Sequence, residues 1–376
     1  MSLPSQTLDP ARKRVCLLVI GMHRSGTSAV THVLSLMGAG LPQNLLGATP
    51  GGNPLGHWEA KRLIVAHDAL LAEAGSGWDD WQPLTFKNLP PERLAYHKDQ
   101  LRRLIAEEYG DEPLFVLKDP RVCRFVPLSI DVLAEMGIAT CAVITFRNPL
   151  EVAASLLVRD NMPKMDGMLL WLRNVLDAER GSRGLPRVIL GYDRLLAEGV
   201  GAVGDLGPRL GVSMAIPSEV VAAEIENALR RDLRHHAIGA DELGRDPIAA
   251  GWAAEAFAAL SALATDEADA AARSTLDRVA LEFGRATPWL AAQQTAAQAS
   301  EAKARQAVAT LSARVASVEL ELKGREADVA ARQLQYDTLV GSRPWRLASA
   351  LASSYSHLPR PMKRALEWVF DRLSRH

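Results

Sequence analysis

A short cation-bearing loop is the segment best suited to chemistry. The chain reads VCLLVIGMHRSGTS from Val15 to Ser28, an aliphatic run followed by a Gly/Ser/Thr-rich turn. Such a turn between a strand and a helix exposes backbone N–H groups that bind anions. The segment nearly matches the Walker A pattern, which places a lysine directly after the second glycine. Here Thr27 takes that position, and the cation, Arg24, precedes Gly26.

Two further cationic clusters follow apolar runs later in the chain. The segment KDPR (118–121) follows the run 114–117, and RNP (147–149) follows the run 139–146. Ligands of open parallel sheets gather at the carboxyl ends of the strands. Three cationic strand ends at one edge therefore predict a pocket for a ligand with several anionic groups. Taken separately, each cluster has a plainer interpretation as a helix cap or as solvated charge.

Strand and helix patterns alternate from residue 15 to about residue 197. Strands are expected at 15–20, 114–117, 139–146 and 187–190, and helices at 29–37, 59–74, 127–136, 150–159 and 167–180. This alternation indicates an α/β fold with a P-loop-like, doubly wound parallel sheet. A Gly/Pro/Asn-rich loop over 41–56 is unusually long for an ordinary connection.

The remainder of the chain is expected to be helical. Residues 200–285 are Ala-rich, and from 290 to 337 apolar residues recur at alternating steps of four and three, at Ala304, Val308, Leu311, Val315, Val318 and Leu322, with Val329 and Tyr336 in phase. Gly324 and Arg325 interrupt the stripe. The spacing predicts a coiled coil and a homo-oligomer. The alternative is a single amphipathic helix folded back on its own domain.

The C-terminal tail combines apolar residues with positive charge. From Arg343 onward it has seven Lys/Arg and two Asp/Glu. Such a tail can rest on an anionic membrane surface, or it can cap the coiled coil or a partner. The predicted organisation is a disordered tail at 1–14, an α/β domain with a helical C-terminal part at 15–285, a coiled coil at 286–340 and a basic amphipathic tail at 341–376.

Composition narrows the class of protein. The chain has 376 residues and a formal net charge of −1, which gives no electrostatic support for nucleic-acid binding. Its three cysteines lie in or beside apolar runs and are expected to be reduced core residues. With no signal-like N-terminus and no long apolar stretch, we expect a cytoplasmic protein, or one peripheral to the inner face of the membrane.

The loop resembles the 5′-phosphosulfate loop of sulfotransferases that use 3′-phosphoadenosine 5′-phosphosulfate. The residues that match this loop are Arg24, Ser25, Gly26, Thr27 and Ser28. The family's 3′-phosphate site has an arginine at a strand end and a serine eight residues later, as Arg147 and Ser155 stand here. Tyr192 in GYDRLL resembles a segment near the adenine. The resemblance covers about residues 15–197 and is nearest to bacterial sulfotransferases of cell-surface glycan pathways.

The resemblance implies a sulfotransferase fold and a sulfuryl donor site without an obligatory metal. It also implies a hydroxyl acceptor, such as a carbohydrate or glycolipid of the cell envelope. Arg24 and the loop amides would stabilise the leaving phosphate, and Lys118 would assist on the sulfuryl oxygens. The Gly-rich Arg-Lys-Gly lid of the eukaryotic cytosolic branch is absent from this sequence.

The expected general base is Glu59, which follows the Gly/Pro loop in HWE and resembles a catalytic glutamate of several branches. The alternative is that Glu59 sits in the first turn of a helix and favours its dipole. Asp119 and His57 are second choices, although Asp119 could equally pair with Arg121 and shape its loop. Trp58 is expected either to stack on a ligand ring or to pack in the core.

Two other functions remain open at the level of sequence. A P-loop kinase or NTPase would need a lysine in place of Thr27 and an acidic magnesium ligand at a strand end. A non-catalytic assembly protein of glycan synthesis would rely on the coiled coil and the tail. The intact set of Arg24, Arg147 and Ser155 argues against a decayed nucleotide site.

Overall fold

The computed structural model describes residues 14–47, 56–215, 217–229, 238, 240–249 and 251–374. The chain divides into two compact units, Met1–Ala291 and Ala292–His376. The boundary expected at 285/286 falls inside one continuous helix, α13 (Ala270–Gly341). The predicted N-terminal tail, apart from Arg14, and residues 48–55 of the Gly/Pro-rich loop lie outside the described residues.

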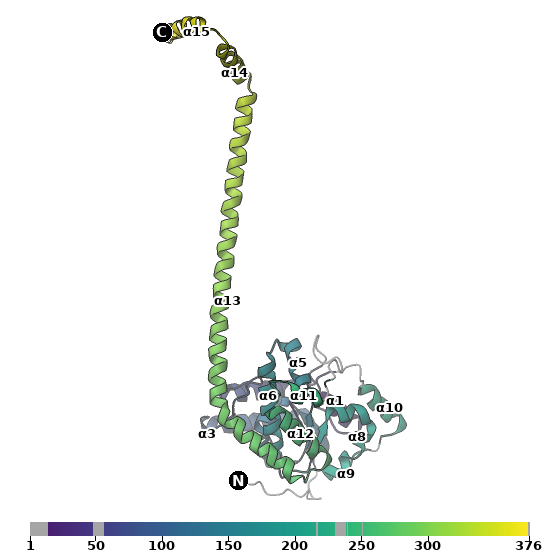
Figure 1. The fold of residues 1–376 in the computed structure, drawn as a ribbon. Helices are drawn as coiled ribbons and strands as arrows, with labels where there is room; N and C mark the ends of the chain where they lie inside the picture. Colours follow the sequence, from purple (N-terminus) through teal and green to yellow (C-terminus); the bar gives the residue numbers. More distant parts are fainter. Residues whose placement is uncertain are drawn as a thin grey trace. The chain divides into compact units, whose positions relative to one another are not determined.

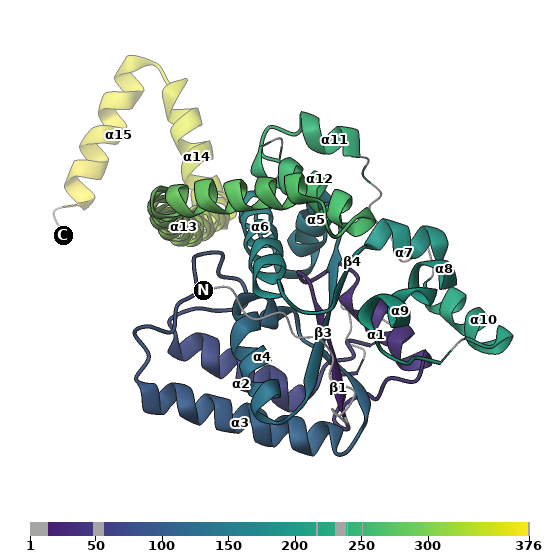
Figure 2. The same cartoon turned by 90° about the horizontal axis from the view of Figure 1, so that it is seen from below.

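The first unit is built on a parallel sheet (Figure 2). Its strands are β1 (Val15–Ile20), β2 (Leu114–Lys118), β3 (Ala139–Phe146) and β4 (Arg187–Gly191), in the spatial order β2-β1-β3-β4. The predicted strands are confirmed to within one residue at each end. They could be found because strands buried on both faces are continuous aliphatic runs.

Helices cover both faces of the sheet (Figure 2). Leu18 and Ile20 of β1 join one apolar cluster, whereas Leu17 and Val19 join the other. The first cluster includes α2 (Lys61–Glu73), α3 (Pro91–Tyr109), α4 (Val126–Glu135), α5 (Pro149–Asp160), α6 (Lys164–Gly181), α11 (Ala240–Arg245), α12 (Trp252–Thr265) and the start of α13. The second includes α1 (Thr27–Leu36), α7 (Tyr192–Glu198), α8 (Val200–Gly204), α9 (Leu206–Leu210) and α10 (Glu219–Ala228). The α/β prediction with a parallel sheet is confirmed.

Two local expectations differ from the structure. Helix α3 was not predicted from the sequence, because many charged residues surround its apolar stripe of Leu101, Leu104 and Ile105. Helix α2 begins at Lys61 rather than at residue 59. The segment before it is extended, since Ala60 forms an antiparallel bridge with Leu45.

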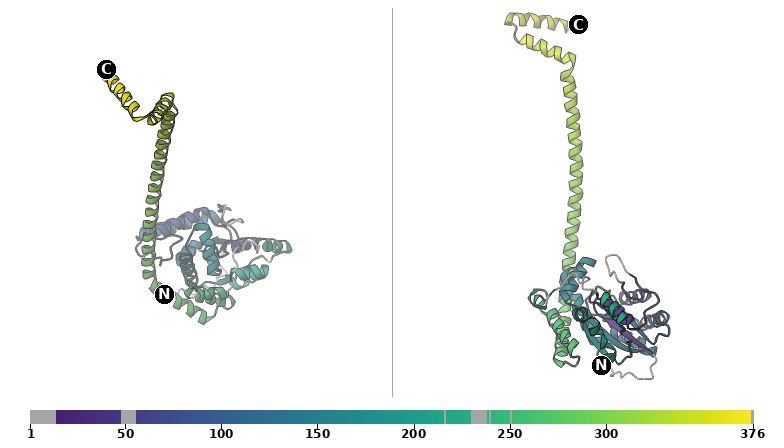
Figure 3. Two further views of the ribbon diagram at one scale, coloured as in Figure 1. Left: turned by 45° about the horizontal axis from the view of Figure 1, so that its top comes forward. Right: turned by 90° about the vertical axis from the view of Figure 1, so that its right-hand side faces the viewer.

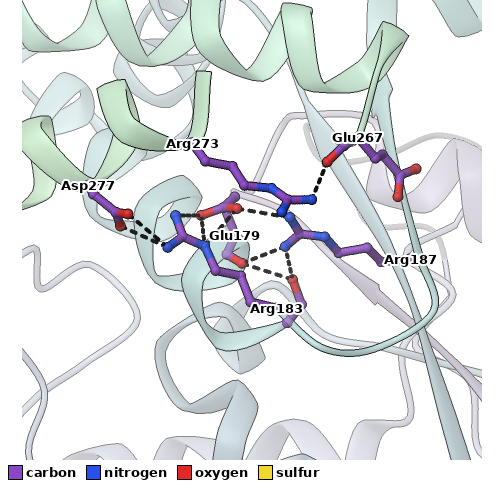
Figure 4. A network of polar contacts seen from close by, with 7 residues as sticks. Glu179, Arg183, Arg187, Glu267, Arg273 and Asp277 are labelled. Carbon is purple, nitrogen blue, oxygen red and sulfur yellow. Dashed lines mark hydrogen bonds and ion pairs between the residues drawn. The ribbon is translucent and has the colours of Figure 1, made fainter. Parts of the chain in front are cut away.

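An ionic network links α6, β4 and the first turns of α13 (Figure 4). Its Glu179–Arg187 pair is buried, whereas its Arg183–Asp277 pair is partly exposed. The Glu179 carboxylate, which is 1% exposed, accepts hydrogen bonds from Arg183 at 2.7 Å and from Arg187 at 3.0 Å. Arg183 also donates to Asp277 of α13 at 2.8 Å. Arg273 of α13 donates to the backbone carbonyl of Glu267. The start of α13 is therefore an integral part of the first unit.

The second unit contains the distal part of α13, followed by α14 (Arg343–Ser356) and α15 (Arg360–Leu373) (Figures 1 and 3). The Ser342 hydroxyl caps α14 by accepting from the Trp345 amide at 3.3 Å. Tyr355 of α14 donates to Glu367 of α15. Within the described part of the chain, every helix is too short or too polar to cross a bilayer. The expected membrane contact of the tail stays a prediction.

Replacing Glu179 tests the ionic network. In Glu179→Gln, Arg187 keeps its charge at a buried position without a carboxylate, so we expect the free energy of unfolding to fall by about 3 kcal/mol. The matched control is Glu198→Gln, whose exposed pair with Arg194 should contribute less than about 0.5 kcal/mol. Urea unfolding of both variants gives the comparison. Equal small losses would show that the network contributes nothing specific.

Candidate active site

The carboxyl ends of β1 and β3 lie side by side at the point where the strand order reverses. The chain leaves β1 toward β2 on one side and returns to β3 on the other. Ile20 of β1 is in register with Ile144 of β3. Crevices at such a point hold the ligands of open α/β sheets. The loops that follow β1 and β3 carry the two predicted anion-binding motifs.

The loop after β1 is a tight turn that leads directly into α1. Arg24 and Gly26 have φ angles of 69° and 89°, both in the left-handed region. The Ser25 amide donates to the Met22 carbonyl at 3.1 Å. A Cβ on Gly26 would lie 2.3 Å from Cδ2 of Tyr192, so only glycine allows the ring to approach. Tyr192 is thereby packed against the loop, while its expected place near an adenine stays a prediction.

The first turn of α1 has backbone donors that no side chain caps. Three polar side-chain atoms around it are also buried without a hydrogen-bond partner among the described residues: His23 Nε2, Ser25 Oγ and Thr145 Oγ1. Buried polar atoms normally have partners. The combination of unpaired donors and a helix N-terminus is suited to binding an anion.

The structure brings the two arginine motifs into contact. Arg24 Nε donates to Ser155 Oγ of α5 at 2.7 Å, across 131 residues of sequence. Arg147 donates to the Arg24 carbonyl at 3.3 Å and pairs with Glu151 at 2.6 Å. Its guanidinium also lies over the Tyr192 ring, 5.1 Å from the centroid. Residues expected to hold one ligand thus lie together beside the start of α1.

Arg159 of α5 adds a cation that sequence reasoning missed. Burial, followed by the charges of Arg159 and Arg147, lowers the pKa of Arg24 from its usual value. Arg159 pairs with Asp160 at 2.7 Å and stacks over the Trp78 ring at 5.2 Å. Its position four residues after Ser155 could have identified Arg159 as a site residue, because that spacing places both side chains on one face of α5.

A buried acid–base pair joins β2 to the loop before α2. Lys118 forms an ion pair with Glu59 and donates to Ser28 Oγ at 3.1 Å and to the His57 carbonyl at 2.9 Å. Glu59 is 5% exposed, and burial raises the pKa of its carboxyl despite the opposing charge of Lys118. Because Glu59 precedes α2, the alternative that it occupies the first turn of a helix is wrong.

Asp119 lies in a different environment from Glu59. It accepts from the Arg121 amide at 3.0 Å at the start of the short 3-10 helix η1 (Pro120–Phe125) and is 2.8 Å from His67 Nδ1. Burial would raise the pKa of Asp119, but His67 and Arg121 outweigh it and hold that pKa below its usual range. This arrangement favours the loop-shaping role of Asp119 over a catalytic one.

The aromatic residues divide between core and site. Trp81 is buried against Phe283 in the core, whereas Trp78 meets the His23 ring edge-on at 5.0 Å. Trp58 is partly exposed and stacks on His32 with ring centroids 4.3 Å apart. Trp58 and Trp78 therefore join Tyr192 as partly exposed aromatic side chains near the loop.

Among the residues that the structure describes, no group of three or more His, Cys, Asp and Glu side chains is arranged to hold a metal ion. The loop has Thr27 rather than lysine after Gly26. Arginine and lysine side chains, together with the N-terminus of α1, supply positive charge at this site.

No protein-family model and no curated protein matches the sequence. The sulfotransferase domain from the Synechococcus PCC 7002 olefin synthase is similar at 19% identity over 66% of this chain and 90% of that domain, with a TM-score of 0.34. The sulfotransferase domain from the curacin biosynthetic pathway is similar at 16% identity over 73% and 98%, also with a TM-score of 0.34. A TM-score of 0.34 is too low to assign a function by structural similarity. A functional conclusion therefore depends on the residues of the site.

The environment of His23 predicts a pH dependence of stability. Burial, then the charges of Arg159, Arg121 and Lys118, hold the pKa of His23 well below its usual range, with Asp119 opposing. The unfolded chain takes up this proton near pH ~6.5, but the folded chain does not. Stability conferred by neutral His23 is therefore lost as pH falls below ~6.5, by about 1.4 kcal/mol per pH unit.

His23→Gln removes this proton uptake from the unfolded chain. We expect its free energy of unfolding to fall less steeply between pH 7.5 and pH 5 than that of the wild type, as measured by urea unfolding at several pH values. Parallel pH profiles for the two proteins would contradict a neutral, buried His23.

Proposed function

We propose that this chain transfers a sulfuryl group from 3′-phosphoadenosine 5′-phosphosulfate to a hydroxyl acceptor, on a sulfotransferase-type fold. The observation that carries the proposal is the contact of Arg24 with Ser155 and Arg147 beside the uncapped start of α1. A phosphosulfate-type loop and a candidate 3′-phosphate site, far apart in sequence, meet at one sheet edge. Inorganic phosphate or a nucleoside monophosphate carries less negative charge than this donor, and would need fewer cations than this site contains.

The donor supplies an activated sulfuryl group and two phosphates. The 5′ end is assigned to Arg24, Ser25, Gly26, Thr27 and Ser28, and the 3′-phosphate to Arg147 and Ser155, with Tyr192 near the adenine. Arg159 lies on the same face of α5 as Ser155, where it adds a further positive charge. Guanidinium groups suit this task because they donate two parallel hydrogen bonds to phosphate.

The reaction requires little covalent chemistry from the protein. The acceptor oxygen forms a bond to sulfur, while the bond from sulfur to the bridging oxygen breaks and leaves negative charge on the 5′-phosphate. Arg24 and the amides of the loop stabilise that charge, and Lys118 is assigned to the sulfuryl oxygens. The acceptor's proton goes to Glu59.

Glu59 suits the role of general base because burial raises the pKa of its carboxyl toward neutrality. The Lys118 ammonium holds it in place and stabilises its ionised form. His57 is the second candidate: burial and the charges of Lys118, Arg159 and Arg24 lower the pKa of its imidazole, which therefore stays neutral. Asp119 is the weakest choice, because it is occupied by His67 and Arg121.

The acceptor is proposed to be a carbohydrate or glycolipid of the cell envelope, modified on the cytoplasmic side. Trp58 and Trp78 support this class, because both side chains are partly exposed and aromatic rings pack against sugar rings. A P-loop kinase is disfavoured by Thr27 in the lysine position.

Nucleotide binding is the first test of the proposal. We expect adenosine 3′,5′-bisphosphate to raise the unfolding temperature of the full chain, and Arg24→Ala to weaken that binding at least tenfold through loss of a charged phosphate contact. Arg62→Ala, which breaks an exposed surface pair, is the matched control. Stabilisation by ATP with magnesium alone would instead indicate a kinase or NTPase.

Transfer of labelled sulfate to a cell-envelope glycan extract tests the base. Glu59→Gln is expected to lower kcat by about 10²- to 10⁴-fold while leaving the affinity for adenosine 3′,5′-bisphosphate nearly unchanged. Glu107→Gln at the surface serves as the control. Equal transfer by wild type and Glu59→Gln would exclude Glu59, and His57→Gln would then be compared in the same assay.

A further inference from the structure

The distal part of α13 presents an apolar stripe that its own chain leaves exposed. Large side chains recur with a strict heptad spacing and are each about half exposed or more: Val308, Leu311, Val315, Val318, Leu322, Val329, Tyr336 and Leu339. Within these heptads, residues 308, 315, 322, 329 and 336 occupy one set of core positions (a), and 304, 311, 318, 325, 332 and 339 occupy the other (d). An isolated helix of this length gains nothing from such a stripe in water.

The residue types at these positions favour two parallel strands. Three of the five a positions are valine, at 308, 315 and 329, and the d positions include Leu311 and Leu339. β-Branched residues at a with leucine at d fit the packing geometry of a parallel dimer. The remaining faces of the helix are mostly small or polar.

The charges that flank the stripe are complementary to a second copy in register. Arg314 lies at position g, directly before Val315, and Glu319 lies at position e, directly after Val318. In a parallel dimer, residues at g and at the following e, five positions later on the partner helix, form interhelical ion pairs. Arg325 and Arg332 occupy d positions, where two copies bring like charges together. Glu321, Glu326 and Asp328 lie on the flanks of these two arginines and offset their charge.

We propose that residues 301–339 pair with the same segment of a second copy of this chain, as a parallel and in-register two-stranded coiled coil. The partner is a second copy of this chain, because the apolar stripe of one copy fits that of the other and Arg314 of one copy can pair with Glu319 of the other. Parallel pairing brings both copies of the basic α14–α15 tail to one end of the coil. This inference is independent of the proposed chemistry.

The mass of the full chain tests self-association. We expect a dimer by sedimentation at micromolar concentration, and a monomer for the double variant Leu311→Glu/Leu322→Glu, whose carboxylates would be buried in the interface. The matched double variant Ala313→Glu/Ala327→Glu places the same charges on the opposite face and should remain dimeric. A monomeric wild type, or equal masses for the two double variants, would overturn the proposal.

Cysteine crosslinking tests the orientation. Val308→Cys and Leu339→Cys, each made singly in the full chain, should form a disulfide with the same residue of the second copy under mild oxidation. Ala313→Cys, on the outer face, should not. The native cysteines compete little, because all three are buried and burial raises the pKa of Cys123 and Cys141 to about 12. Failure of both core variants to crosslink would exclude parallel, in-register pairing.

Discussion

The crowding of positive charge at the start of α1 is the constraint on which the site depends. Burial, and then the positive charges of Arg159 and Arg147, lower the pKa of Arg24 from its usual value. Glu151 and Asp160 offset part of this charge, through one pair each. An anion with several charges would relieve the remaining repulsion, and its binding would stabilise the folded chain.

The strand order and two local backbone features keep these charges close together. The strand order places β1 beside β3, so that the loops after both strands open at one edge. Gly26 allows Tyr192 to approach, and Asn148 caps α5 by accepting from the Leu150 amide at 2.9 Å. The cap fixes where α5 begins, and with it the positions of Ser155 and Arg159. Local backbone geometry thereby sets the electrostatics of the site.

Much of this arrangement could be predicted from the sequence. The strands were identifiable because parallel strands buried on both faces are continuous aliphatic runs, and Arg147 and Ser155 lie at a recognisable spacing. The pairs Lys118–Glu59 and His67–Asp119 could not be predicted, since they join residues 59 and 52 positions apart and no local pattern links them. Helix α3 was not predicted, because charged residues obscure its apolar stripe.

The proposed function requires this cationic site to bind a nucleotide that carries phosphates on both its 3′ and 5′ positions. Calorimetric titration of the full chain with adenosine 3′,5′-bisphosphate and, separately, with adenosine 5′-monophosphate tests it most directly. We expect at least tenfold tighter binding of the bisphosphate, and loss of that preference in Arg147→Ala. Equal affinities for the two nucleotides in the wild type would contradict it.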